Sequence, residues 1–110
     1  MPLPALTEAV YYILLSLTKP MHGYGIIQNA EQLSRGRVRL AAGTLYGAIN
    51  TLLEKGWIRA LPEEQDSRRK EYVITEKGRE ALYGELGRLR ELVKNGEMIL
   101  EGDCCEKDRA

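Results

Sequence analysis

The sequence contains no phenylalanine, one histidine, one tryptophan and two cysteines. Cys104 and Cys105 are adjacent in a polar stretch near the C-terminus. Neighbouring cysteines rarely form a disulfide, and two thiols without a nearby histidine do not complete a tetrahedral zinc site. No nucleophile has a histidine and an acid arranged around it, and no phosphate-binding glycine loop follows a predicted strand. We therefore expect no catalytic residue, no metal site and no cofactor.

A long hydrophobic run is also lacking. The apolar run at residues 10–15 is far shorter than the roughly 20 residues that span a bilayer, and the N-terminus has no basic leader. A chain of 110 residues, 44% of them hydrophobic, suits one small domain. We expect a soluble, cytoplasmic protein with no membrane partner.

The chain has no net charge, with 16 basic and 16 acidic residues, but the charges are unevenly distributed. Residues 35–59 hold five basic residues and one acidic residue, a net charge of +4. Residues 76–110 hold seven basic and nine acidic residues, a net charge of −2. A basic centre beside an acidic C-terminal part fits one surface that meets phosphates.

Residues 43–58 carry the most informative pattern, a short helix that ends at a glycine and leads into a strand. Apolar side chains recur along one face of this helix, at Leu45, Ile49, Leu52 and Leu53. The opposite face holds small or polar residues, namely Gly43, Gly47, Asn50 and Thr51, with Thr44 and Tyr46 at its flanks. Gly56 suits a helix C-terminus. This pattern is typical of the recognition helix of a winged helix-turn-helix, which enters the DNA major groove.

The elements around the recognition helix complete this fold. Proline positions predict a first helix over residues 4–19, and periodicity predicts a second over residues 23–33, with Ile26, Ile27, Ala30 and Leu33 in the core. Residues 19–23 are expected to form a turn, and alternation at residues 37–40 predicts a very short strand with Arg35, Arg37 and Arg39 on one side. Strands at residues 57–61 and 70–74, joined by a polar turn, form a hairpin that would serve as the wing.

Thr75 is a good N-cap for a last helix. Leu82, Leu86, Leu89 and Val93 repeat at heptad spacing along it, and Asn95-Gly96 is expected to break it. We predict a mostly α protein with a small β-hairpin: a winged helix-turn-helix domain over residues 1–75, a C-terminal dimerisation helix over residues 76–100 and a disordered tail over residues 101–110.

Several short motifs now also resemble the PadR family of bacterial transcriptional regulators. They are Tyr11-Tyr12-Ile13-Leu14, His22-Gly23-Tyr24-Gly25-Ile26, Gly43-Thr44-Leu45-Tyr46, Leu53-Glu54-Lys55-Gly56-Trp57-Ile58, Arg69-Lys70-Glu71-Tyr72 and Thr75-Glu76-Lys77-Gly78. They cover roughly residues 5–80 in the family's order. The resemblance implies a homodimeric winged-helix protein that binds an operator and usually represses transcription, often until a small-molecule effector releases the DNA. Gly47 replaces a proline that many relatives carry after the tyrosine.

The residues expected to contact DNA come from four segments. They are Thr44, Tyr46, Gly47, Asn50 and Thr51 on the recognition helix, His22 and Tyr24 at the second helix, Arg37 and Arg39 before the recognition helix, and Arg68, Arg69 and Lys70 in the hairpin. Tyrosine and arginine contact phosphates, whereas asparagine is suited to adenine. Each of these residues also has a plainer interpretation. Tyr46 would lie at the edge of the core without a function, the polar residues of the helix would simply be solvated, and the arginines would be ordinary surface charges. For His22 we expect a hydrogen bond at the start of the second helix.

The first helix is apolar on more than one side, so part of it is expected to meet a second subunit. The expected dimerisation residues are Tyr11, Tyr12, Leu15, Leu82, Leu86, Leu89 and Val93. An effector, if the protein has one, would be a small aromatic molecule bound between the subunits near the two tyrosines. The alternative function is a winged-helix module that binds protein rather than DNA.

Overall fold

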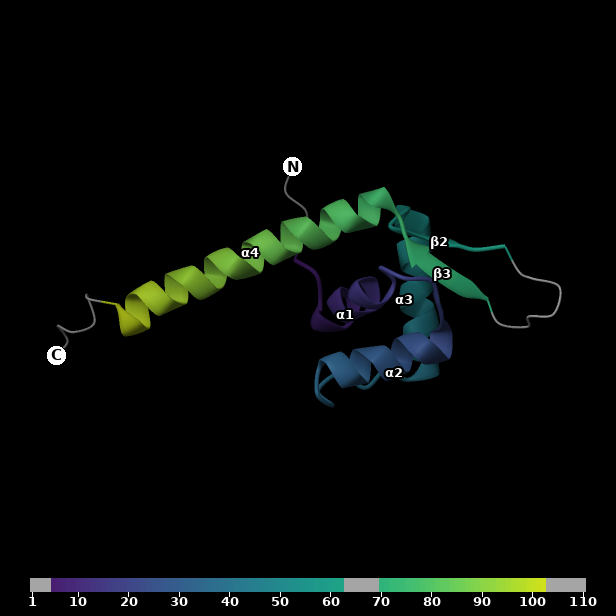
Figure 1. Cartoon of the computed structure of the whole chain (residues 1–110), viewed down its shortest axis with the longest axis horizontal. Coiled ribbons are helices and arrows are strands. Elements are labelled where there is room, and N and C mark those ends of the chain that lie inside the picture. Colours follow the sequence, from purple (N-terminus) through teal and green to yellow (C-terminus); the bar gives the residue numbers. More distant parts are fainter. Residues whose placement is uncertain (1–4, 63–69, 103–110) are drawn as a thin grey trace.

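The computed structural model describes residues 5–62 and 70–102. In chain order, these residues form α1 (Glu8–Ser16), β1 (Met21–His22), α2 (Gly23–Leu33), α3 (Ala42–Lys55), β2 (Ile58–Ala60), β3 (Glu71–Ile74) and α4 (Glu76–Glu101). The first three helices pack beside a small sheet, and α4 leaves this body as a long arm (Figure 1). This arrangement confirms the predicted mostly helical winged helix-turn-helix.

Side chains and one glycine set the helix ends. The hydroxyl of Thr7 accepts a hydrogen bond from the amide of Val10 at 3.1 Å, and so caps α1. Thr75 caps α4 in the predicted way, accepting from the amide of Gly78 at 3.1 Å. Gly56 ends α3 in the left-handed region, with φ of 76°, where a residue without Cβ is favoured. The first helix is shorter than predicted, because the Thr7 cap fixes its start at Glu8.

The sheet has the strand order β1-β3-β2, and both pairs are antiparallel. The predicted hairpin is present with slightly shorter strands, and Ile58 lies opposite Ile74. The strand predicted over residues 37–40 is wrong: these residues form no strand, and the amide of Val38 instead donates to the hydroxyl of Ser34 at 2.8 Å. The strand forms in the predicted turn, where Met21 pairs with Tyr72, because β3 offers an open edge there. The alternation that placed three arginines on one side therefore does not apply.

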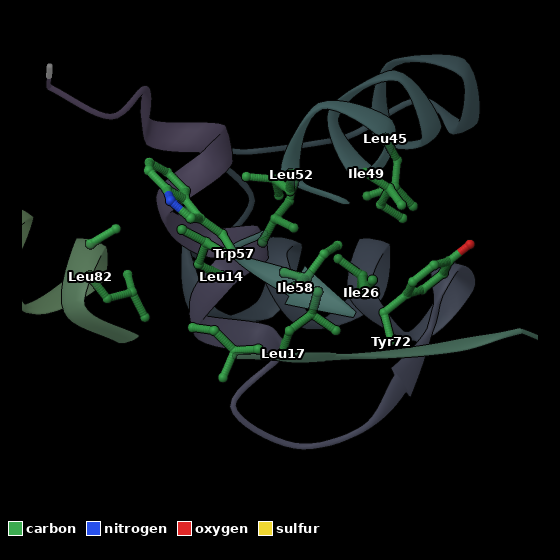
Figure 2. Packing of buried hydrophobic residues seen from close by; sticks show 13 residues of the cluster. Leu14, Leu17, Ile26, Leu45, Ile49, Leu52, Trp57, Ile58, Tyr72 and Leu82 are labelled. Atoms are coloured by element: carbon green, nitrogen blue, oxygen red, sulfur yellow. The ribbon is translucent and has the colours of Figure 1, made fainter. Parts of the chain in front are cut away.

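The core lies where α1, α2, α3, the sheet and the first turns of α4 meet. Its buried side chains are Ile13, Leu14, Leu17, Ile26, Leu45, Ile49, Leu52, Trp57, Ile58, Tyr72, Ile74, Ala81 and Leu82, most of which are labelled in Figure 2. Leu33 was expected in the core but is 50% exposed, since the last turn of α2 passes beyond the other elements. The core holds α3 by one face and leaves the other face outward.

The last helix continues without a break through Asn95 and Gly96, contrary to the prediction. An interior glycine costs about 1 kcal/mol and no proline follows it, so an established helix continues past it. The heptad spacing therefore reaches Leu100, seven residues after Val93. Five apolar side chains on this arm are more than half exposed: Leu92, Val93, Met98, Ile99 and Leu100. Among the helices of the described residues, none is long and apolar enough to cross a membrane.

Candidate nucleic-acid interface

The two faces of α3 differ in burial in the way the sequence predicted. Leu45, Ile49 and Leu52 are buried. The predicted DNA-contacting residues of this helix are all exposed: Thr44, Tyr46, Gly47, Asn50 and Thr51. Ala41, at the N-cap, has no side chain that accepts a hydrogen bond, so the first amides of α3 have no side-chain cap. The outward face thus combines short polar groups with a helix N-terminus, which attracts anions.

Tyr46 lies at the junction between α3 and the start of α2. Its side chain is 46% exposed, so it belongs neither to the core nor wholly to the solvent. A methyl group placed on Gly23 would overlap the Tyr46 hydroxyl, which means that the ring tip rests directly on the glycine. Gly23 thus allows this close approach and positions the phenol at the first turn of α2.

His22 is the N-cap of α2, and its Nδ1 accepts a hydrogen bond from the amide of Gly25 at 3.2 Å. The expected hydrogen bond at the start of the second helix is therefore confirmed. An acceptor at Nδ1 means that the neutral ring carries its proton on Nε2. Tyr24, two residues after His22, is 63% exposed. A phosphate contact by either side chain stays a prediction.

The two arginines ahead of α3 form ion pairs on the surface. Arg37 lies 3.5 Å from Glu8, and Arg39 lies 3.7 Å from Glu31. Both arginine side chains are about three-quarters exposed, at 74% and 75%. Pairs of this kind contribute about 0–1 kcal/mol, so the arginines can exchange a carboxylate for a phosphate at little cost.

Of the three hairpin residues expected to contact DNA, only Lys70 lies within the part of the chain that the structure describes. Lys70 is exposed immediately before β3. Arg68 and Arg69 lie outside the described residues, and their contact with DNA stays a prediction. Within residues 5–62 and 70–102, no group of His, Cys, Asp and Glu is placed to hold a metal ion.

The predicted dimerisation residues fall into three environments. Leu82 is 8% exposed and belongs to the core of its own chain. Tyr11, Leu15 and Leu86 line a groove of about 140 Å³ between α1 and α4. Tyr12 and Leu89 line a neighbouring groove of about 300 Å³. Val93 lies on the free arm. Part of the apolar surface of α1 is therefore covered by the same chain's α4.

Two residues that the sequence did not single out are buried near these surfaces. Glu85 is 6% exposed, and it accepts hydrogen bonds from Nε of Arg88 at 3.0 Å and from the amide of Leu6 at 3.4 Å. The hydrogen bond from Arg88 lowers the pKa of Glu85, so this carboxylate stays charged and ties residue 6 to α4. The second residue is Tyr72. Burial raises its pKa, and the nearby Tyr46 raises it further, so at neutral pH this phenol keeps its proton.

Comparison with known proteins agrees with this geometry. The family model described as "Transcriptional regulator PadR-like family" matches residues 12–84. An uncharacterised 37.1 kDa protein in transposon TN4556 of Streptomyces fradiae is 38% identical over 76 residues, which are 68% of this chain and 21% of that protein. The chain thus spans about a fifth of the length of this relative.

Solved structures share the fold. A PadR family transcriptional regulator from Eggerthella lenta DSM 2243 superposes with a TM-score of 0.67 and 23% identity, over 86% of this chain and 82% of that one. Bacillus subtilis PadR in complex with operator DNA superposes with a TM-score of 0.59 and 19% identity, over 71% of this chain and 45% of that one. At sequence identities this low, the superpositions show that the chains share a fold.

Proposed function

The chain belongs to the PadR-like family of transcriptional regulators, and from this premise we propose that it binds a DNA operator as a homodimer and represses transcription there. The family is one of regulators rather than enzymes. The observation that carries the proposal is the outward face of α3, which is exposed, small and polar while the opposite face is fixed in the core. A buried stripe holds the helix rigidly, and short side chains allow it to approach base edges closely.

The surroundings of α3 support the same function. The exposed arginines Arg37 and Arg39 precede it, and Lys70 follows the hairpin turn. Cations around a recognition helix supply sequence-independent attraction to the phosphates, which fixes the position of the protein on the duplex. The operator is the proposed partner, and the cytoplasm, where such an operator is met, is the proposed compartment.

The arm formed by α4 supports the proposed homodimer. Its apolar side chains at Leu92, Val93, Ile99 and Leu100 are more than half exposed. Val93 and Leu100 continue the heptad spacing that begins at Leu82, and Leu92 and Ile99 each precede one of them on the adjoining flank, a pattern typical of helices that pair with a second helix. Two copies joined through this arm would present two α3 helices to two half-sites.

The first prediction separates base reading from phosphate attraction. The operator sequence is first identified by selecting duplexes that the protein binds from a random pool. Gel shifts then measure the affinity of the protein for this operator and for a scrambled duplex. We expect Asn50→Ala to lose about 1–3 kcal/mol of binding on the operator if the amide contacts adenine with two hydrogen bonds. Binding to the scrambled duplex should change little. Gln32→Ala, which removes an exposed amide from the far end of α2, is the control and should bind like the wild type.

Two outcomes would contradict this prediction in different ways. Equal losses on operator and scrambled duplexes would mean that Asn50 does not read a base. Failure of the wild-type protein to enrich any duplex, together with no salt-dependent binding, would overturn DNA binding altogether. The winged helix would then serve as a module that binds protein.

The second prediction concerns release by a small aromatic effector, which we propose binds between the two subunits beside Tyr11 and Tyr12. The grooves on α1 and α4 measure about 140 and 300 Å³, at or below the roughly 300–1,000 Å³ of small-molecule sites, so a second subunit would complete the walls. A flat aromatic compound that releases the operator in a gel shift should act at least about tenfold more weakly on Tyr12→Ala. Equal release from this variant would place the pocket elsewhere.

A further inference from the structure

We propose that the hydroxyls of Tyr72 and Tyr46 together bind one phosphate of the DNA backbone at the first turn of α2. The inference rests on the proposed DNA binding and deepens it. It adds a residue of the wing strand β3 to a contact that the sequence assigned to α3 and α2 alone. The observation behind it is that the hydroxyl of Tyr72 has no hydrogen-bond partner among the residues that the structure describes.

Tyr72 is 7% exposed, and its ring is part of the core cluster. Its hydroxyl makes no hydrogen bond to any residue in the described ranges 5–62 and 70–102. Figure 2 shows the oxygen at the edge of the cluster, pointing away from the other labelled side chains. The ring is therefore held by the core while the hydroxyl lies at its edge, where it can donate a hydrogen bond to an acceptor from outside the chain.

The strand pairing places Tyr72 close to the start of α2, where Tyr46 also lies. Met21 in β1 lies opposite Tyr72, and β1 leads directly into α2 at Gly23. The tip of Tyr46 rests on that same glycine. Tyr46 also raises the pKa of Tyr72, which places the two phenols within electrostatic reach. Three elements therefore meet here: the central strand β3, the start of α2 and the flank of α3.

A phosphate matches the chemistry of this junction better than a cation does. Both phenol hydroxyls can donate a hydrogen bond, and the first amides of a helix have no acceptor within the helix. Hydroxyls and helix N-termini are among the common partners of DNA phosphates. Tyr46 is 46% exposed, so a phosphate oxygen can reach this side of the junction from outside the chain.

The test removes each hydroxyl and keeps each ring. Tyr72→Phe, Tyr46→Phe and the double variant are compared with the wild type, using operator and scrambled duplexes at two salt concentrations. Each single variant should bind both duplexes roughly tenfold more weakly, since a hydrogen bond to a charged group is lost and phosphates carry no sequence information. The double variant should lose less than the product of the two single losses, because both groups hold one phosphate.

Tyr83→Phe is the control, because this tyrosine is 68% exposed on α4 and should bind like the wild type. Tyr72→Phe should melt no lower than the wild type, since the native hydroxyl makes no hydrogen bond within residues 5–62 and 70–102. Unchanged DNA affinity of Tyr72→Phe beside a loss in Tyr46→Phe would overturn the inference while leaving DNA binding intact. A wild-type protein that binds neither duplex would instead overturn the proposed function, and this site with it.

Discussion

Replacing Val93 and Leu100 with glutamate should convert the homodimer into monomers and weaken operator binding by about two to four orders of magnitude. The magnitude is that of avidity, because joining two binding modules raises the effective concentration of the second by a factor of this size. Both side chains are exposed within one chain, at 58% and 77%, so the substitutions leave the core untouched. In a paired helix each glutamate would be buried opposite apolar groups without a partner.

Sedimentation at micromolar concentration measures the oligomeric state, and gel shifts on the selected operator measure the affinity. Asn95→Glu is the matched control, since it places the same charge in the same exposed part of α4 but not on the seam of Leu89, Val93 and Leu100. This control should remain a dimer. A monomeric wild type, or a dimer that survives both substitutions, would show that the subunits do not associate through this arm.

Gly78→Ala should lower the free energy of unfolding by about 1–3 kcal/mol, the usual cost of an extra group in a tightly packed site. A methyl group at this position would overlap the backbone carbonyl oxygen of Trp57 and lie 2.7 Å from Cγ1 of Ile74. The carbonyl cannot move aside easily, because it accepts a hydrogen bond from the amide of Thr75 at 2.9 Å. The first turn of α4 would therefore shift away from the sheet.

Denaturant unfolding at equal protein concentrations measures this loss, since the stability of a dimer depends on concentration. Gly84→Ala, in the same helix, is the control because a methyl group there meets nothing within 4 Å. This change should raise the free energy of unfolding by up to about 1 kcal/mol, as alanine is the better helix former. If both variants unfold alike, contact with Trp57 is not what requires glycine at position 78.

Features that depend only on neighbouring residues could be predicted before the fold was known. The two faces of α3 follow from the spacing of Leu45, Ile49 and Leu52, because a helix places such positions on one side. The left-handed end at Gly56 and the cap at Thr75 follow from residue type, since glycine and threonine suit those backbone conformations. The hairpin followed from two apolar runs around a polar turn. A recognition helix, a wing and an arm were therefore predictable.

Other features depend on contacts between residues that are distant in sequence, and these contacts can override the local preference of a segment. Residues 37–40 alternate like a strand but have no partner, whereas Met21–His22 became β1 because the open edge of β3 lies beside it. Leu82 repeats like an interface residue but faces its own core, because the first turns of α4 pack against α1 and β3. Tyr72 pairs with Met21 across about 50 residues of chain, which brings β3 to the start of α2. A pattern fixes which face of an element is apolar, but only the packed fold determines what covers that face.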